Sequence, residues 1–321
     1  AADDLELSLA QGLRGPRSGA AARRFLTHWR AYGLLQWQLR TLVRPWLERV
    51  TPAGRVHVSW DTTRNAERGK LMGARTGRLS STPNFQNVGK ADPPGGLTNP
   101  RTWIRAPRGM RLVGGDLAQQ EPRITAHFAG GSFVDELWTN PRTDFHASTA
   151  RLMNVDRDPA KTLGLAVVYA LGLDALARRL GRSRAEAQAL RFAFYRARPE
   201  IAALDQALRL AWATGQALVT WAGAEVKVEP TPEEPGRWAY RALNTLIQRS
   251  AAEQLKRAMI TAFRAGVPLV LSVHDELIAC VPRERAEPTR KTLQDALEHT
   301  GEWRVPFVAD TKVGTTWKSV K

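Results

Sequence analysis

The chain has 321 residues, of which 43% are hydrophobic, so it can bury a sizeable core as one large or two modest domains. Lys and Arg total 47 against 31 Asp and Glu. The resulting net charge of +16 favours a polyanionic partner, nucleic acid before an anionic membrane surface, although a merely soluble basic protein would show the same excess.

Cysteine usage and hydropathy indicate the cellular compartment in which the protein works. The single cysteine, Cys280, excludes a disulfide framework and a cysteine-based zinc site, and it fits a reducing cytosol. The first residues show no basic-then-apolar signal pattern, and the longest uncharged apolar run, residues 163–173, is too short to span a bilayer. We therefore expect a cytoplasmic protein with no membrane partner.

The first third of the chain alternates between helix, strand and loop. Residues 21–50 mix Leu, Trp and Arg at helical spacing, which predicts a helix, and GRVHVSW (54–60) alternates like a strand. Residues 74–100 are rich in Gly, Pro, Asn, Ser and Thr, which predicts a loop. Residues 111–128 predict a short strand that reaches Asp116 and is followed by a helix.

The remainder is mostly helical. Residues 143–213 predict an almost wholly helical segment, and the arginine excess over 178–209 fits either a solvated helical face or a nucleic-acid track. A hairpin with a Pro-rich loop, a long helix, a second hairpin with HDE at its turn and a final helix are predicted over residues 216–236, 239–265, 267–282 and 284–300. Strands interleave irregularly with helices, which predicts the α+β class.

Two acids stand at the ends of apolar strands, Asp116 after LVGG and Asp275 after LVLSVH. Either one alone is most simply a cap on the turn that follows it. A pair brought side by side would need a cation between the carboxylates, and oxygen ligands of this kind suit Mg²⁺. Two such ions could activate an attacking hydroxyl and stabilise a leaving oxygen in phosphoryl transfer.

The segment RDPAKTLGLAVVYALG (157–172) predicts a helix that Asp158 can cap. Arg157, Lys161, Leu165 and Tyr169 are spaced by four and therefore share one face. This face fits an amphipathic core helix with two snorkelling cations. It equally fits a phosphate grip at the positive end of the helix dipole, followed by an apolar and aromatic platform for a base.

Five blocks in order now resemble the polymerase domain of family A DNA polymerases, the DNA polymerase I type, over roughly residues 30–321. The blocks are TGRLSSTPNFQN (76–87), GGDLAQQEPRITAHF with Asp116, Gln119, Glu121 and Arg123 in register, RDPAKTLGLAVVYALG, RALNTLIQRSAAEQLKRAM (241–259) and VHDE (273–276). The resemblance implies a right-hand fold with a shortened thumb leading into the palm (1–60), a first part of the palm with Asp116 (61–134), fingers (135–240) and a second part of the palm with Asp275 (241–321).

The resemblance also implies a function: templated addition of dNTPs to a primer 3′-OH by two-metal phosphoryl transfer. The cofactors would be two Mg²⁺ ions, for which Mn²⁺ can substitute, held by Asp116, the Leu117 carbonyl and Asp275. Glu276 would be an auxiliary acid, with a solvent-exposed turn acid as the alternative. The partners would be primer–template DNA, dNTPs and a processivity or accessory protein, in a bacterial nucleoid or a phage-infected host cytoplasm.

Further residues are implied to hold the two substrates. Arg157, Lys161 and His146 would bind the triphosphate, and Lys161 could protonate departing pyrophosphate, although a lone histidine is more often structural. Glu121 would lie beneath the sugar and exclude a 2′-hydroxyl, and Tyr169 would stack near the templating base, with Gln119 and Leu165 completing the nucleotide site. DNA contacts are implied for the minor-groove donors Arg78, Arg241, Asn244 and Gln248, for His274, and for Asn84 and Asn87, which could instead be turn formers.

The sequence departs from the family at several points. Leu165 stands where Phe or Tyr is usual, Ala166 and Ala170 replace glycines, and Arg241 is one residue closer to Asn244 than in the common bacterial pattern. The chain shows no block that resembles a proofreading or 5′-nuclease domain, so we expect a minimal polymerase without exonuclease activity in this chain. Two alternatives stay open: a single-subunit RNA polymerase, which Glu121 opposes, and a non-catalytic DNA-binding relative, which the intact Asp116, Lys161 and Asp275 oppose.

Overall fold

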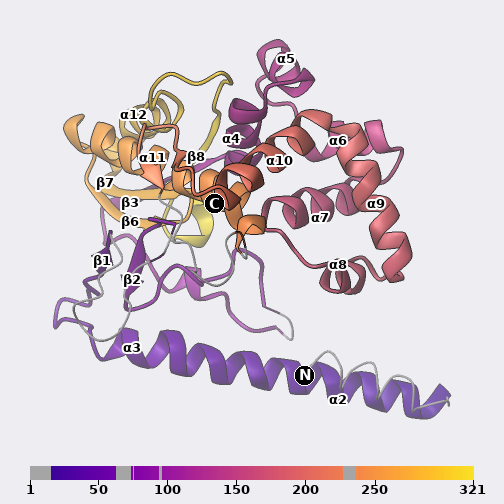
Figure 1. Ribbon diagram of the computed structural model, residues 1–321. Helices are drawn as coiled ribbons and strands as arrows, with labels where there is room; N and C mark the ends of the chain where they lie inside the picture. Colours follow the sequence, from indigo (N-terminus) through magenta and orange to yellow (C-terminus); the bar gives the residue numbers. More distant parts are fainter. Residues whose placement is uncertain (1–15, 63–73, 75, 94–95, 227–235, 237) are drawn as a thin grey trace.

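The computed structural model describes residues 16–62, 74, 76–93, 96–226, 236 and 238–321. They are organised around a four-stranded antiparallel sheet in the order β6–β7–β3–β8 (Figure 1). Its strands are β3 (Met110–Leu117), β6 (Leu269–Val273), β7 (Glu276–Pro282) and β8 (Ala309–Gly314). The predicted strand to Asp116 and the predicted hairpin around HDE are thereby confirmed, whereas β8 was not predicted.

The two faces of the sheet pack into different cores because successive side chains of a strand point to opposite sides. Val113 and Leu277 belong to the larger cluster, which is covered by α11 (Ala242–Arg264) and α12 (Ala286–Glu298). Leu112 and Ile278 belong to the second cluster, which is built with Trp46, Phe85 and Trp317. The sheet is therefore buried on both sides, and the site lies at one end of its strands.

Two glycines allow close packing on both faces of β3. A Cβ atom at Gly115 would come within 2.5 Å of Leu297 on α12, and one at Gly114 would come within 2.6 Å of the Val320 carbonyl oxygen. Val320 ends the 3-10 helix η5 (Lys318–Val320), which lies across the strand. Glycine is needed at both positions because real Cβ contacts do not reach these distances.

A helical layer follows β3 and extends from the sheet toward the right of Figure 1. Its helices are α4 (Gln120–Ala129), α5 (Ser132–Thr139), α6 (Phe145–Met153), α7 (Arg157–Val168), α8 (Leu173–Leu180), α9 (Arg184–Ala197) and α10 (Pro199–Ala213). A short hairpin, β4 (Leu218–Val219) and β5 (Glu225–Val226), then leads through η3 (Ala239–Arg241) to α11. The helices predicted within residues 143–213 are confirmed.

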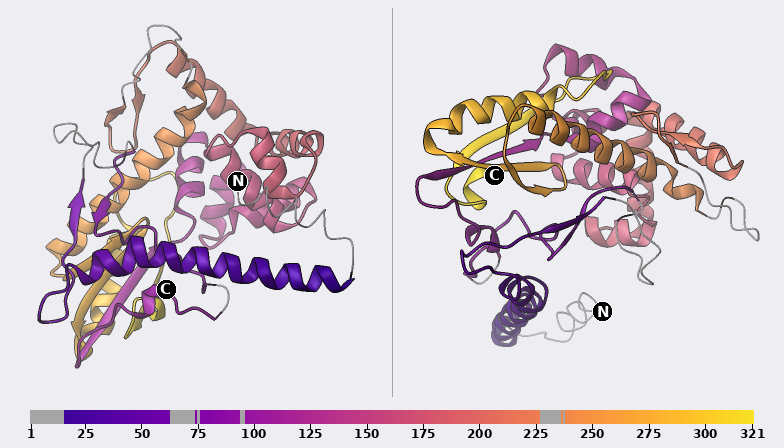
Figure 2. Two further views of the ribbon diagram at one scale, coloured as in Figure 1. Left: turned by 90° about the horizontal axis from the view of Figure 1, so that it is seen from below. Right: turned by 90° about the vertical axis from the view of Figure 1, so that its left-hand side faces the viewer.

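The N-terminal part is one long helix, α2 (Pro16–Gln38), which continues through a π-helical turn (Leu39–Val43) into α3 (Arg44–Leu47). The right-hand view of Figure 2 shows α2 end-on, at the edge of the molecule. The predicted helix is thus confirmed, but the predicted strand over 54–60 is largely wrong. Only Ser59–Asp61 forms a strand, β1, which pairs antiparallel with the equally short β2 (Ser80–Thr82). β2 lies inside the segment predicted as loop.

Short 3-10 segments, η2 (Pro100–Thr102) and η4 (Arg283–Arg285), complete the described elements. Among the described helices, none is long and apolar enough to cross a membrane.

Candidate active site

Asp116 and Asp275 lie next to each other at one end of the sheet. Asp116 pairs with Glu276 across β3 and β7, and the Leu117 amide donates to the Asp275 carbonyl oxygen at 3.2 Å. Lys90 Nζ lies 3.2 Å from Asp116 Oδ1 and 3.9 Å from Asp275 Oδ1, so one cation contacts both carboxylates. The two strand-end acids are therefore brought together, and their arrangement accepts a positive charge.

The turn that carries Asp275 is held by a loop side chain. His274 has a left-handed backbone with φ of 55°, which lets the two-residue turn between β6 and β7 close tightly. Its amide donates to Gln86 Oε1 at 3.1 Å, and Gln86 Nε2 donates to the Ser272 carbonyl at 3.0 Å. His274 is exposed at one side of its ring, and partial desolvation of the other side, together with the nearby Arg78 and Lys90, lowers its pKa.

The surroundings of the two carboxylates shift their pKa values in opposite directions. Burial and the neighbouring Asp116 raise the pKa of Asp275 to about 6. Burial also acts to raise the pKa of Asp116, but the cations Lys321 and Lys90 outweigh it and lower that pKa below its usual value. The pKa of each acid therefore depends on the charge of the other acid and on the two lysines beside them.

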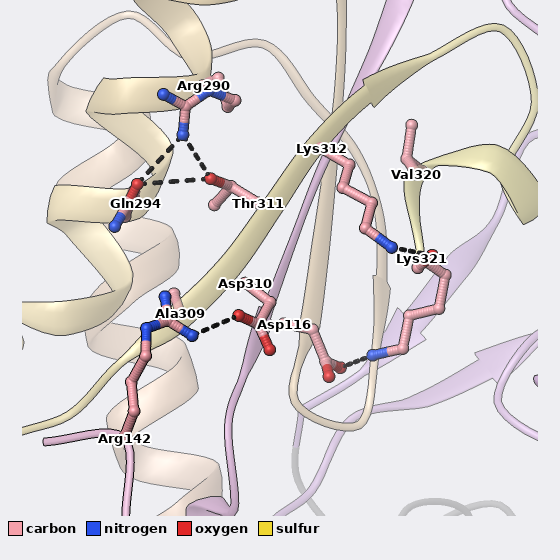
Figure 3. A pocket seen from close by; sticks show the side chains of 10 residues that line it. All are labelled: Asp116, Arg142, Arg290, Gln294, Ala309, Asp310, Thr311, Lys312, Val320 and Lys321. Atoms are coloured by element: carbon pink, nitrogen blue, oxygen red, sulfur yellow. Dashed lines mark hydrogen bonds and ion pairs between the residues drawn. The ribbon is translucent and has the colours of Figure 1, made fainter.

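Two lysines at this site, Lys90 and Lys321, were not predicted from the sequence. Lys321 pairs with Asp116 from the side of β8 (Figure 3). Lys90 reaches the same carboxylate from the loop after β2. Neither lysine belongs to a motif, and both reach Asp116 only through long-range packing. A cavity of about 500 Å³ adjoins Asp116 on the β8 side, where Arg142 pairs with Asp310 at 3.0 Å.

The solvent-exposed alternative for Glu276 is wrong. Its side chain is only 1% exposed, and Arg101 Nη1 binds its Oε2 at 3.0 Å. Trp317 Nε1 donates to its other oxygen at 2.9 Å, and the Arg101 guanidinium stacks 4.1 Å over the Trp317 ring. Both carboxylate oxygens are therefore engaged in a buried cluster, and Glu276 is not a solvent-exposed turn acid.

Helix α7 presents the predicted face. Arg157 and Lys161 are exposed and Leu165 is partly exposed, whereas Leu163 and Val167 on the opposite side are buried. Asp156 rather than Asp158 is the N-cap residue, and Tyr169 follows the last helical residue. The face is thus accessible to a ligand along its whole length.

Of the residues expected at the triphosphate, Arg157 is paired within the protein and His146 is buried. Arg157 Nη2 binds Asp144 Oδ2 at 2.6 Å, and Asp144 in turn caps α6 by accepting from the Ala147 amide. His146 lies buried on α6 against Gly164 of α7, and its Nδ1 has no hydrogen-bond partner in the described part of the chain. Burial chiefly, with Arg157 and Lys161 adding to it, lowers the pKa of His146 to about 4, so the imidazole is neutral at neutral pH.

Glu121 gathers three of the predicted residues around one oxygen. Its Oε1 accepts from Arg78 Nη2 at 2.7 Å, from the Tyr169 hydroxyl at 2.9 Å and from Gln248 Nε2 at 2.5 Å. These donors come from the loop before β2, the end of α7 and the middle of α11. The carboxylate that the sequence places beneath the sugar is therefore held in place from three directions.

Two of the remaining predicted residues bind the protein's own backbone. Gln119 accepts from the Phe145 amide at 2.8 Å, and Asn84 Oδ1 accepts from the Asn87 amide at 3.1 Å, as a turn former does. Arg241 stacks 4.0 Å over Trp238 and is the N-cap residue of α11, the helix that carries Asn244 and Gln248. Asn244 Nδ2 is buried and finds no acceptor among the described residues.

Comparisons with known proteins agree with this arrangement. The family model described as DNA polymerase family A matches residues 19–319. The chain belongs to DNA polymerase family A. Among its relatives, the thermostable DNA polymerase I of Thermus aquaticus is 30% identical over 303 residues, and DNA polymerase I of Chloroflexus aurantiacus is 32% identical over 284 residues.

The chain matches only part of each family A relative. The alignments cover 88% and 82% of this chain, but 35% and 29% of the two relatives, so the chain spans about a third of their length. The POL domain of Pol1 from M. smegmatis, solved in complex with DNA primer–template and dNTP, superposes with a TM-score of 0.77 at 24% identity over 98% of this chain and 55% of that one. This likeness confirms the α+β, right-hand polymerase fold.

Proposed function

We propose that the chain is a DNA-templated DNA polymerase that adds dNTPs to a primer 3′-OH. The observation that carries the proposal is the placement of Asp116 beside Asp275, within a family A fold whose helix α7 exposes Arg157 and Lys161. Phosphoryl transfer needs little covalent chemistry from the protein, because positioning and charge stabilisation supply most of the rate. The net charge of +16 suits a nucleic-acid partner.

The carboxylate pair fits Mg²⁺, because one ammonium group already lies within 4 Å of an oxygen from each acid. Asp116, Asp275 and the Leu117 carbonyl would hold the metal, and substrate oxygens would complete its coordination, since the described residues contain no cluster of three or more His, Cys, Asp or Glu side chains that could do so. When bound, Mg²⁺ would lower the pKa of the primer hydroxyl and neutralise charge on the phosphates.

The chain's own residues would orient the nucleotide. Lys161, exposed on α7, would contact the triphosphate and donate a proton to pyrophosphate as it leaves. Arg157, held by Asp144 at 2.6 Å, would approach the phosphates in a fixed direction. Neutral His146 would act as a hydrogen-bond donor rather than as a cation.

Glu121 would exclude a 2′-hydroxyl, because Arg78, Tyr169 and Gln248 hold its carboxylate in place. This arrangement favours a DNA polymerase over the RNA polymerase alternative, and comparison of dNTP with NTP incorporation tests the choice.

The same proposal assigns the parts of the hand. β3 from the segment 61–134 and β6, β7 and β8 from the segment 241–321 form one sheet, which would be the palm. The helices between them, within 135–240, would be the fingers, and α2, within 1–60, would be the shortened thumb.

Primer extension with each single dNTP, with and without Mg²⁺, tests the function. Asp116→Ala and Asp275→Ala should each abolish extension while an electrophoretic shift assay shows primer–template binding close to that of the wild type. Extension near the wild-type rate in either variant would defeat the assignment. Template-independent or Mg²⁺-independent products would defeat the function itself.

A further inference from the structure

Lysine is unevenly distributed in this protein. The sequence holds nine lysines among its 47 cationic residues, the rest being arginine. Four of the nine lie at Asp116 or at the main chain of a lysine that contacts it: Lys90, Lys312, Lys318 and Lys321. An ammonium group is a compact positive charge that can approach the oxygens of two neighbouring carboxylates at once, so the position of these lysines is physically meaningful.

Two of these lysines contact the acids directly. Lys90 Nζ bridges Asp116 and Asp275 at 3.2 and 3.9 Å. Lys321 Nζ pairs with Asp116, as Figure 3 shows. The side chain of Lys321 is only 17% exposed, so its charge is weakly screened by water. The oxygen that both ammonium groups contact, Asp116 Oδ1, is one that a divalent ion would use.

The other two lysines hold the first two in place. Lys318 Nζ donates to the Lys90 carbonyl at 2.8 Å, and Lys312 Nζ donates to the main-chain oxygen of Lys321 at 2.8 Å. Gly114 adds to this support, because its missing side chain lets Val320 lie against β3 and so brings Lys321 to Asp116. Each contacting ammonium thus belongs to a residue whose main chain is bound by a second lysine.

We infer that Lys90 and Lys321 are built-in counter-cations that compete with divalent metal ions for Asp116 and Asp275, and that they set the metal concentration the protein requires. The inference rests on the proposed function, in which these acids hold the metal. An ammonium group and a divalent ion cannot occupy the same carboxylate oxygen at once, and they repel each other at such distances. Metal binding therefore requires both lysines to move away.

Mn²⁺ binding to the whole chain, measured by electron paramagnetic resonance without DNA or nucleotide, tests the inference. Lys90→Gln and Lys321→Gln should each lower the Kd for Mn²⁺ by about three- to tenfold, the scale of one partly screened charge at contact distance. Lys90→Arg, which keeps the charge, should stay within about twofold of the wild type. Lys291→Gln, at an exposed lysine on α12, is the matched control and should leave the Kd unchanged.

The outcomes separate the two hypotheses. Unchanged or weaker Mn²⁺ binding in both Lys→Gln variants would overturn the inference. If Lys321→Gln does not fold, Lys312→Ala loosens Lys321 through its main chain and should tighten Mn²⁺ binding in the same direction. If Asp116→Ala does not reduce Mn²⁺ binding to the otherwise wild-type chain, the metal site of the proposed function fails, whatever the lysines do.

Discussion

Replacing Glu276 by Gln removes one charge from the buried cluster of Arg101, Glu276 and Trp317. Arg101 and Glu276 are each 1% exposed and lie 3.0 Å apart, so the variant leaves a guanidinium buried without its counter-charge. Breaking such a pair costs about 3–5 kcal/mol. The lower end applies here, because Gln can still accept from Trp317 and because Arg101 keeps two bonds to the Val88 carbonyl.

A loss of about 3 kcal/mol over a chain of this size corresponds to a fall of roughly 4–5 °C in Tm, since unfolding entropy is about 2 cal/mol/K per residue. Thermal unfolding followed by circular dichroism measures it. Asp174→Asn is the matched control: Arg184 and Asp174 also lie 3.0 Å apart, but both are about 70% exposed, so Tm should stay within about 1 °C.

Primer extension well below Tm separates a structural role from a catalytic one. Since both Glu276 oxygens are bound within the cluster, the rate per folded molecule should fall by less than about tenfold, the effect of a small displacement of Asp275 next to it. A Tm equal to that of the control would refute the buried ion pair. A rate loss as large as that of Asp275→Ala, with Tm unchanged, would show that Glu276 takes part in catalysis.

Four further outcomes are expected. Leu165→Phe should lower the KM for dNTP in steady-state extension by up to about 1–3 kcal/mol of stacking energy, and an unchanged or raised KM would show that this position does not face the nucleotide. Tyr169→Phe removes one donor from Glu121, so the ratio of NTP to dNTP incorporation should rise severalfold, by about 1 kcal/mol, and an unchanged ratio would contradict the role of that hydroxyl. In the folded protein the pKa of His146 is about 4, whereas in the unfolded chain it is about 6.5, so the free energy of unfolding should fall by up to about 3 kcal/mol as the pH drops from about 6.5 to about 4. Urea unfolding of His146→Gln should show a flatter pH dependence, and an equally steep one would argue against the buried neutral ring. A mismatched primer should survive incubation with this chain, and shortening from its 3′ end would contradict the expected lack of exonuclease activity.

Strong local patterns explain the part of the site that the sequence predicts. Asp116 and Asp275 follow apolar strands that are buried on both faces, and Arg157, Lys161 and Tyr169 recur with the helical period. Burial and period are properties of neighbouring residues, so the strands, the helix and their exposed side chains follow from short stretches of chain.

Long-range contacts explain the part that it does not predict. Glu276 is buried by Arg101, 175 residues away in sequence, and nothing beside it distinguishes a buried acid from one exposed at a turn. Lys321 reaches Asp116 only because β8 pairs with β3, and β8 alternates too weakly to be recognised as a strand. The opposite error occurs at 54–60, where alternation is present but a strand partner of sufficient length is not.

The two glycines of β3 bear on how mutational data for this protein should be interpreted. Gly114 and Gly115 contact no substrate in the proposed mechanism, yet a methyl group at either would displace Val320 or Leu297, and the strand that carries Asp116 would shift with them. A displacement of about 1 Å at a reacting group can cost about a hundredfold in rate. A saturation scan scored on activity alone would therefore rank Gly114 and Gly115 with the two carboxylates. Only a parallel scan for folded protein would distinguish glycines that are needed for close packing from acids that are needed for catalysis.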